Sequence, residues 1–438
     1  MDLEEQFRKL YVRYKGDEEK ILSEGKKYTS AAKAKAIIEE IKSMRNISDK
    51  FTKFLCECPE AKISANDSGL GCRGTGDFFI HRKIADIIGR TSAVIDPTHQ
   101  DDAGVVFVDD DYISVAVDGM HSRLSCFPFL AGFHAARAAL RDIIVMGSVP
   151  ISMFSDIHLA NDGDVGKVFD YTAGIVAVSE LSNVPLVTGS TLRIGGDLVL
   201  GDRLTGCVGA VGHSKNITPR KDAVPGDVIL MTEGCGGGTI TTTALYNNYH
   251  AAVKETLNVD NIQTGIALLK SPHIKNVHAM LDVTNGGIRG DAHETSEGAG
   301  VRIILDEEKI RSVVNPKVLR MLEKLDIDFL GVSLDSFVFI LPQIHVSDLM
   351  KFMNKKKMKV EVVGRVEKGR GVFIKSKNKI KPLPKLFRES PYTPIKKVVD
   401  KGTSRRFEDA KDDIERAARL AILKKEKIKK WIRGRVRE

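Results

Sequence analysis

From Asp77 to about residue 375, the chain alternates between short apolar runs and longer stretches with helical periodicity. The runs at 103–108 and 112–118 have the β-branched content of neighbouring strands, joined through an acidic turn. The stretches at 129–147 and 165–183 carry apolar residues at helical spacing. Strands at 151–160, 185–190 and 204–212 complete the first half of the pattern. This alternation predicts a mixed α/β (α+β) fold.

Proline and glycine interrupt the pattern near residues 219–226, which indicates a boundary between two units. In the second unit we expect strands at 227–233, 301–305, 336–342 and 360–366. Residues 61–76 are small, polar and rich in glycine, and are predicted to be a loop. The expected organisation is a helical N-terminal extension at 1–65, a first domain at 66–220, a second at 221–384 and a basic helical tail at 385–438.

Composition excludes several classes of protein. Hydrophobic residues make up 42% of the 438 residues, enough for a packed core, so wholesale disorder is excluded. No apolar stretch approaches the ~18 residues of a membrane-spanning helix, and the acidic start does not resemble a secretory signal. Six cysteines are few for this length, so we expect a reducing cytoplasm.

The net charge of +9 is concentrated at the C-terminal end. Residues 396–438 contain 16 Lys/Arg and 8 Asp/Glu, so the rest of the chain is nearly neutral. Residues 424–438 hold eight basic residues against two acidic ones. Such a run could bind RNA, an acidic protein or a membrane surface. A solvated helix is the favoured interpretation, because only Trp431 offers an aromatic ring for stacking.

Four aspartates lie at the ends of expected elements. Asp101 and Asp102 precede a strand, Asp118 closes the next one, and Asp142 lies near the end of the long helix. Carboxylates that converge without partners raise each other's pKa, and Mg²⁺ held by carboxylates and substrate phosphates removes that cost. Taken singly, each aspartate also fits a helix cap or a surface position.

Two glycine clusters, at 234–238 and 284–290, could bring backbone N–H groups close to phosphate oxygens. Neither completes a Walker A loop, because no Gly-Lys-Ser/Thr follows. The alternative for each cluster is a tight turn or a close packing contact.

Five blocks of sequence stand in a fixed order: DDAGVVFV (101–108), VAVDGMH (115–121), AARAALRDIIVMGSVP (135–150), PGDVILMTEGCGGGTI (225–240) and LDVTNGGIRGDAHETSEGAGVRI (281–303). Taken together, they resemble the aminoimidazole ribonucleotide (AIR) synthetase superfamily, which includes thiamine-monophosphate kinase, selenophosphate synthetase and a hydrogenase-maturation carbamoyl dehydratase. The resemblance implies two α/β domains, with two first domains pairing their sheets into a barrel across a homodimer.

The resemblance also implies ATP and Mg²⁺ as cofactors and a small-molecule substrate. Asp101, Asp102, Asp118 and Asp142 would hold or orient the metal. Asp282 would lie near the nucleotide or substrate, and His121 would face the substrate, although a surface or capping histidine fits equally. The positions implied for nucleotide contact in the two glycine clusters are Gly234, Gly236, Gly237, Gly286 and Gly287.

The loop at 68–79 lies where selenophosphate synthetase has a mobile glycine-rich segment with a catalytic cysteine. Cys72 is therefore a candidate nucleophile, with an unremarkable loop thiol as the alternative. Arg73 and Lys83 could neutralise phosphate charge, or belong to a solvated face. Gly74 and Gly76 join them as candidate nucleotide contacts.

Three departures from the family pattern bear on the reaction. Ser190 stands where a metal-binding aspartate is expected. Asn285 replaces an arginine or aspartate; it can orient a group by hydrogen bonding but cannot act as a base. No cysteine follows Cys235, so we expect the carbamoyl dehydratase reaction in its known form to be absent.

Two hypotheses follow. The first is an ATP- and Mg²⁺-dependent enzyme that phosphorylates or activates a small molecule. The second is a nucleotide-binding or assembly protein with reduced catalysis, whose basic tail binds RNA or protein; Ser190 and Asn285 favour it.

Overall fold

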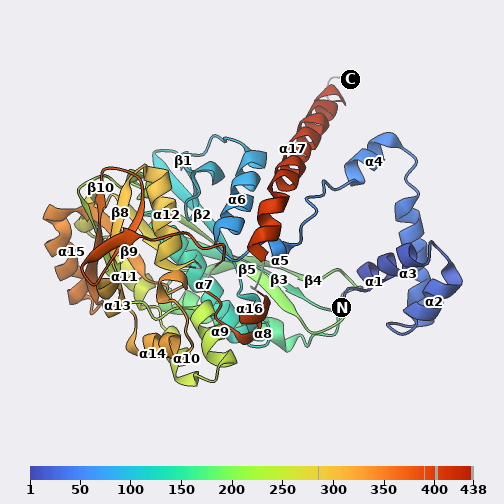
Figure 1. The fold of residues 1–438 in the computed structure, drawn as a ribbon. Helices are drawn as coiled ribbons and strands as arrows, with labels where there is room; N and C mark the ends of the chain where they lie inside the picture. Colours follow the sequence, from blue (N-terminus) through green and yellow to red (C-terminus); the bar gives the residue numbers. More distant parts are fainter. Residues whose placement is uncertain (285, 389, 400–402, 436–438) are drawn as a thin grey trace.

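The structure is a computed structural model that describes residues 1–284, 286–388, 390–399 and 403–435. It confirms the mixed α/β fold (Figure 1). There are two sheets among the described residues, one built from strands of the first half of the chain and the other from strands of the second half. The first sheet has the order β1-β2-β5-β3-β4. Its strands are β1 (Gly104–Val108), β2 (Asp111–Gly119), β3 (Val149–Leu159), β4 (Leu186–Arg193) and β5 (Leu204–Ser214).

The expected hairpin at the start of this sheet is present. β1 and β2 pair antiparallel, with Val108 opposite Asp111. Asp109 and Asp110 form the turn between them with φ values of 47° and 67°. Aspartate tolerates this left-handed conformation, which two-residue hairpin turns need to match the twist of the strands.

The second sheet has the order β12-β11-β8-β10-β6-β9-β7. Its strands are β6 (Asp227–Thr232), β7 (Ala279–Asp282), β8 (Arg302–Asp306), β9 (Phe337–Pro342), β10 (Val360–Glu367), β11 (Gly371–Ser376) and β12 (Lys379–Pro382). The helices of this part are α9 (Gly238–Tyr246), α10 (His250–Thr256), α11 (Asp260–Leu269), α12 (Gly287–Ala299), α13 (Glu307–Ser312), α14 (Pro316–Lys324) and α15 (Gln343–Lys355). The four strands expected here are all found, whereas β7, β11 and β12 had not been assigned as strands.

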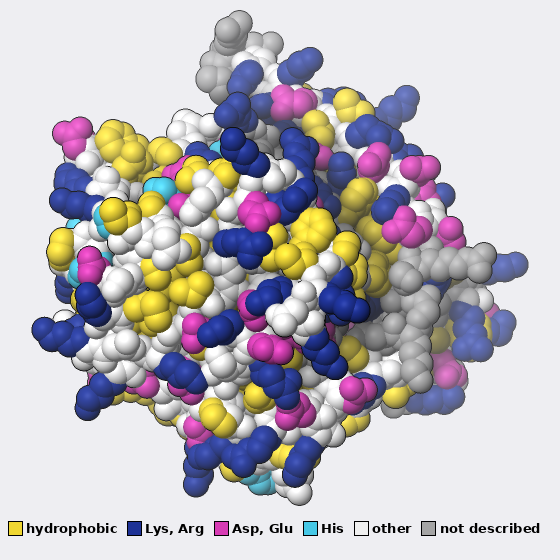
Figure 2. Space-filling view, turned by 60° about the vertical axis from the view of Figure 1, so that its left-hand side comes forward, with side chains coloured by type: hydrophobic (Ala, Val, Ile, Leu, Met, Phe, Trp, Pro, Cys, Tyr) yellow, Lys and Arg dark blue, Asp and Glu magenta, His cyan; other side chains and the backbone are white. Residues whose placement is uncertain are grey.

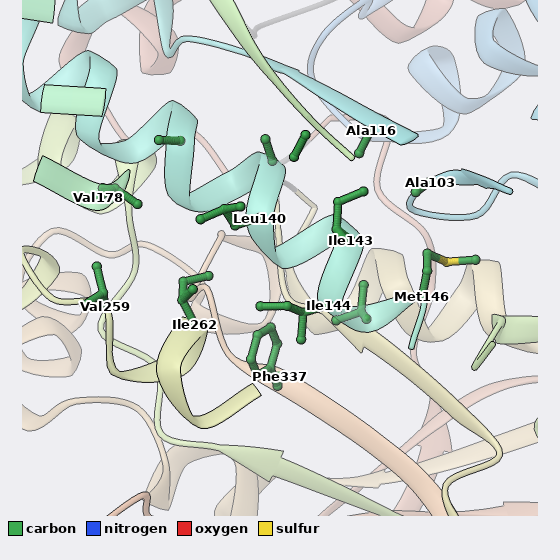
Figure 3. Close-up of a cluster of buried hydrophobic side chains, with 14 of the residues drawn as sticks. Ala103, Ala116, Leu140, Ile143, Ile144, Met146, Val178, Val259, Ile262 and Phe337 are labelled. Carbon is green, nitrogen blue, oxygen red and sulfur yellow. The ribbon is translucent and has the colours of Figure 1, made fainter. Parts of the chain in front are cut away.

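Helix α7 (Pro128–Val145) lies between the two sheets, and α8 (Gly166–Ser182) packs against it. Figure 3 shows Ile143 directed toward Ala116 of β2, while Ile144 lies near Phe337 of β9. Burial on both sides leaves α7 almost no contact with solvent. Polar side chains on α7 are therefore held inside the protein, where each needs a partner.

The N-terminal extension folds into helices, as expected. These are α1 (Leu3–Arg13), α2 (Glu18–Gly25), α3 (Ala31–Arg45) and α4 (Lys50–Cys56). The first three share a small apolar core of their own. They are joined to the loop after β4, where the Leu3 amide donates to the Leu198 carbonyl (2.9 Å) and the Leu200 amide donates to the Met1 carbonyl (2.8 Å).

The prediction of a loop over 61–76 was wrong at two places. A short helix, α5 (Ala65–Ser68), begins behind Ser64, whose hydroxyl accepts from the Asp67 amide at 3.1 Å. Helix α6 (Thr75–Ile88) begins directly after Gly74. Serine is a strong N-cap residue, and this local signal outweighed the small, polar composition.

The C-terminal part is helical, as expected, with α16 (Pro394–Val399) and the long α17 (Thr403–Arg435). α17 crosses α6 and points away from the two sheets (Figure 1). Its Phe407 is buried against the rings of Phe79 and Phe387. Within the described part of the chain, no helix combines the length and apolar character needed to cross a bilayer.

The charge on the rest of the molecule is mixed. Figure 2 brings forward the side of the second sheet, where basic and acidic side chains are interspersed over the surface. This agrees with the near-neutral composition of the chain before residue 396.

Candidate active site

A pocket of about 450 Å³ brings the four predicted aspartates together. Asp101 and Asp102 lie just before β1, Asp118 lies on β2 and Asp142 on α7. The second α/β unit contributes Thr284 and Glu294 to the lining, and Arg73 and Arg220 add two positive charges. The pocket therefore collects carboxylates and guanidinium groups from segments that are far apart in sequence.

Asp118 and Asp142 face each other because of the periodicity of their elements. Ser114 and Ala116 of β2 are buried, so the alternation of the strand directs Asp118 to the same side of the sheet, toward α7. The two carboxyl groups share a hydrogen bond. Burial raises the pKa of both, and the neighbouring Asp118 and Asp282 charges raise that of Asp142 further.

Arg220 joins both halves of the pocket. Its guanidinium forms short ion pairs with Asp102 and Glu294 and lies 3.7 Å from both Asp101 and Asp291. The side chains of Asp101, Asp102 and Arg220 are each less than 10% exposed. This network neutralises part of the acidic wall and ties the segment before β1 to α12.

A second arginine, Arg141 on α7, holds Asp282 in place. Its Nε donates to Asp282 Oδ2 at 2.8 Å, and its Nη1 donates to Asp335 Oδ2 at 2.5 Å. All three side chains are buried. Asp282 is thus a neighbour of the aspartate cluster, although it does not line the pocket itself.

Several buried oxygen atoms around the pocket have no hydrogen-bond partner within the described chain. They are Asp102 Oδ2, Asp282 Oδ1, Thr284 Oγ1 and Asp291 Oδ2. Unpartnered buried acceptors are costly and call for a donor or a cation. A set made of oxygens alone suits a hard cation such as Mg²⁺. Among the described residues no three metal-binding side chains are already arranged around one point, so ligands from a bound molecule would have to complete such a site.

Arg73 points its charge into the pocket from the loop before α6. Burial alone would lower the pKa of its guanidinium, but Glu294 and Asp291 outweigh that effect and raise it. The Arg73 and Gly71 amides both donate to the buried Asp77 carboxylate, at 2.8 and 2.9 Å. A side chain of the first turn of α6 therefore fixes this loop in position.

Cys72 and His121, which were predicted to be catalytic, do not line the pocket. They lie instead beneath the segment of residues 385–388 and 390–393, which we call the C-terminal strap. Arg388 Nη1 lies 3.6 Å from Cys72 Sγ. Tyr392 Oη lies 2.8 Å from His121 Nε2. Burial, aided by Lys396 and Arg123, lowers the pKa of His121 to about 4, so its ring is neutral.

The predicted nucleotide-contacting glycines pack closely against other parts of the chain. A Cβ atom at any of them would lie less than 3 Å from another atom of the protein, such as the Phe387 carbonyl for Gly74 or the Arg73 carbonyl for Gly286. These contacts explain the absence of side chains without reference to a phosphate. The positions are Gly74, Gly76, Gly234, Gly236, Gly237, Gly286 and Gly287.

Of three further residues singled out in the sequence, two lie away from the pocket and one lies outside the described residues. Lys83 forms an ion pair with Asp86 at 3.0 Å, on the side of α6 that faces α17. Ser190 lies exposed on the edge strand β4. Asn285 lies outside the described residues.

Sequence reasoning missed the residues that hold the pocket together. Arg220 lies in the segment 219–226, which indicates only a domain boundary in the sequence. Arg141 directly precedes Asp142, a predicted metal ligand. Thr284 and Glu294 lie in a block quoted for the resemblance, although neither was singled out. An arginine among apolar helix residues was the one signal that pointed to Arg141, because such a side chain needs buried partners.

Comparison with known proteins identifies the family. The model of the AIR synthase related protein N-terminal domain matches residues 100–213, and that of the C-terminal domain matches residues 224–377. An uncharacterized protein of Methanocaldococcus jannaschii is 49% identical over 453 residues, covering 99% of each chain. The thiamine-monophosphate kinase of Pyrococcus horikoshii is 25% identical over 65% of this chain and 88% of its own.

A solved structure shows the same fold. AaThiL, complexed with AMPPCP and TMP, superimposes with a TM-score of 0.56 at 19% identity, over 72% of this chain and 96% of its own. The order of the blocks, the two sheets and these matches agree with one another. The chain belongs to the AIR synthase-related family.

Proposed function

We propose that this protein is an ATP- and Mg²⁺-dependent enzyme that phosphorylates, or activates by phosphorylation, a small molecule. The observation that carries the proposal is the pocket that gathers Asp101, Asp102, Asp118 and Asp142, in which Asp102 Oδ2 and Thr284 Oγ1 are buried without a hydrogen-bond partner among the described residues. Phosphoryl transfer needs mainly positioning and charge stabilisation, which such a pocket supplies.

Asp118 and Asp142 are the best candidates for holding the cation. Neither forms an ion pair with an arginine or lysine of the described chain, whereas Asp101 and Asp102 are engaged by Arg220. Mg²⁺ bound there would neutralise and orient the phosphates. Arg73, which also lines the pocket, would bind phosphate oxygens, and Thr284 could donate its hydroxyl hydrogen to them.

The relatives support a nucleotide in this pocket. One is named a kinase of thiamine monophosphate, and the solved structure with the same fold contains AMPPCP. The acceptor of the phosphoryl group does not follow from the fold, because one fold hosts several reactions.

The test is ATP binding by calorimetry with and without Mg²⁺, in the wild type and in Asp118→Asn. We expect Mg²⁺ to strengthen binding in the wild type and to have little effect in the variant. Asp109→Asn, in the exposed β-hairpin turn, is the matched control and should behave as wild type. Tight ATP binding that is indifferent to Mg²⁺ and to Asp118→Asn would contradict the proposal. A metabolite screen for stimulated ADP release then identifies the acceptor.

Two observations favour a nucleotide-binding protein with reduced catalysis. Arg220 already neutralises Asp101 and Asp102, and Ser190 stands where the family pattern has a metal-binding aspartate. Both features lower the number of carboxylates available to metal ions. ATP and Mg²⁺ binding without ADP release across a broad metabolite screen would support this second function.

We also propose that the first sheet pairs with that of a second copy, as in the family. α7 covers one face of this sheet, and the opposite face exposes Val115, Val117 and Leu192. Exposed apolar side chains in a contiguous face are typical of protein interfaces. Analytical ultracentrifugation should find a dimer, and Val117→Lys should shift it toward monomer; a monomeric wild type would refute the pairing.

The basic tail remains a candidate surface for RNA or an acidic protein. Part of its charge is used within the chain: Lys424 donates to the Glu57 carbonyl at 2.9 Å, Lys425 to the Ile87 carbonyl at 2.6 Å, and Lys427 lies 4.2 Å from the centre of the Phe54 ring. Removal of residues 424–438 should abolish salt-dependent RNA retention if the tail binds RNA. Absence of such retention in the full chain would exclude that role.

A further inference from the structure

A second cavity, of about 560 Å³, opens on the C-terminal side of β6 and shares no lining residue with the aspartate pocket. We call it the polar pocket. It is lined by the segment after β6, the helices α10 and α11, and the turn between α15 and β10. Nearly all of its lining residues are polar or charged.

The deepest charged group of the polar pocket is Arg137 of α7, which is 2% exposed. Its Nη1 donates to the Thr256 carbonyl at 2.8 Å, and its Nη2 lies 3.8 Å from Asp335 Oδ2. Its Nε has no hydrogen-bond partner within the described chain. A buried guanidinium with an unused N–H is a donor prepared for an acceptor that enters the pocket.

The rim of the polar pocket adds positive charge. Lys254, Lys356 and Lys357 are exposed, and none of the three forms an ion pair with another described residue. On the acidic side, Glu255 is already held by Lys317 at 2.6 Å and by the Asn315 amide at 3.1 Å. Glu233 and Asp260 also line the pocket and form no ion pair with another described residue. The three unengaged lysines against these two carboxylates leave the rim a net excess of positive charge, which attracts anions.

We propose that the polar pocket is a second ligand site, which binds a small anionic metabolite through its phosphate or carboxylate group. Arg137 forms the floor of the site, and the three rim lysines complete it. The flexible lysine side chains at the entrance can attract an anion from solvent, and the buried guanidinium of Arg137 can then bind it inside the pocket.

The site is connected to the candidate active site through one carboxylate. Arg137 and Arg141 lie one helical turn apart on α7, and both contact Asp335, at 3.8 and 2.5 Å. Arg141 in turn holds Asp282 beside the aspartate cluster. An anion bound by Arg137 therefore sits at the other end of the ion network that positions Asp282.

Cys235 provides a built-in reporter, because its thiol lines the polar pocket. The probe is inorganic phosphate, compared with chloride at matched ionic strength. The measurement is the rate of iodoacetamide labelling at Cys235, followed by peptide mass spectrometry at alkaline pH. Cys126, which is exposed and lies outside the pocket, serves as the reference thiol in the same sample.

We expect phosphate to slow the labelling of Cys235 and not that of Cys126. The double substitution Lys356→Ala/Lys357→Ala should require about tenfold more phosphate for the same protection, since two surface charges contribute up to about 1 kcal/mol each. Lys355→Ala, at the last residue of α15 and outside the pocket, is the matched control and should behave as wild type. Labelling of Cys235 that is unaffected by phosphate, or equal protection in the double variant, would overturn the proposal.

Discussion

Asp118 of β2 and Asp142 of α7 share a hydrogen bond at the wall of the candidate nucleotide pocket. Two carboxyl groups can do so only if one proton lies between them. Burial raises the pKa of each group, which keeps that proton in place without a cation. A divalent ion would replace the proton and restore both charges, so the pair is a natural position for Mg²⁺.

The substitution Asp142→Asn separates stability from metal binding. The amide can still donate to Asp118 and leaves the pair with the single negative charge that it carries when one proton is shared, so unfolding in urea without Mg²⁺ should show stability within about 1 kcal/mol of the wild type. Calorimetry should show that Mg²⁺ no longer strengthens ATP binding. Loss of stability together with intact Mg²⁺ dependence would show that Asp142 is only structural.

Arg220 is expected to be the main support of the acidic wall. Arg220→Met removes the ion pairs that hold Asp101, Asp102 and Glu294, so stability should fall by about 3–5 kcal/mol. Mg²⁺ should restore part of the loss in this variant and have a smaller effect on the wild type, as measured by urea unfolding. Equal midpoints for variant and wild type would refute the role of Arg220.

The aspartate cluster could be foreseen because its members stand at the ends of expected elements and in blocks that resemble the family. The alternation of strand β2 sets the direction of the Asp118 side chain, and the periodicity of helix α7 sets that of Asp142. Both side-chain directions can therefore be predicted from the sequence. The contact of His121 with Tyr392 could not be foreseen, because the two residues are 271 positions apart and the strap that joins them has no periodic pattern. For the same reason Cys72 was not expected to lie beneath Arg388.

The single tryptophan offers a direct test of how the tail is held. Trp431 of α17 lies against Phe51 of α4, with ring centroids 4.6 Å apart. Phe51→Ala should shift the tryptophan emission to longer wavelength, because the indole becomes more hydrated. Phe107→Ala, in the exposed edge strand β1, is the control and should leave the emission unchanged. An unchanged spectrum in Phe51→Ala would mean that α4 and α17 do not pack in solution.

His134 predicts a loss of stability in acid. Arg137 Nη1 donates to its Nδ1 (3.4 Å), so Nε2 carries the proton and donates to the Thr241 hydroxyl at 2.8 Å. Burial, together with Arg137, lowers the pKa of His134 to about 3. The unfolded chain takes up this proton near pH ~6.5 and the folded one does not. The stability due to neutral His134 is therefore complete above that pH and is lost as the pH falls toward about 3, by about 1.4 kcal/mol per pH unit.

The measurement is urea unfolding of the wild type and of His134→Gln across this pH range. Glutamine keeps an N–H donor for Thr241 but does not titrate, so the pH slope of the variant should be smaller by about 1.4 kcal/mol per unit. His345→Gln, on the surface helix α15, is the control and should keep the wild-type slope. Identical slopes for His134→Gln and the wild type would mean that His134 is protonated in the fold, which its contact with Arg137 does not allow.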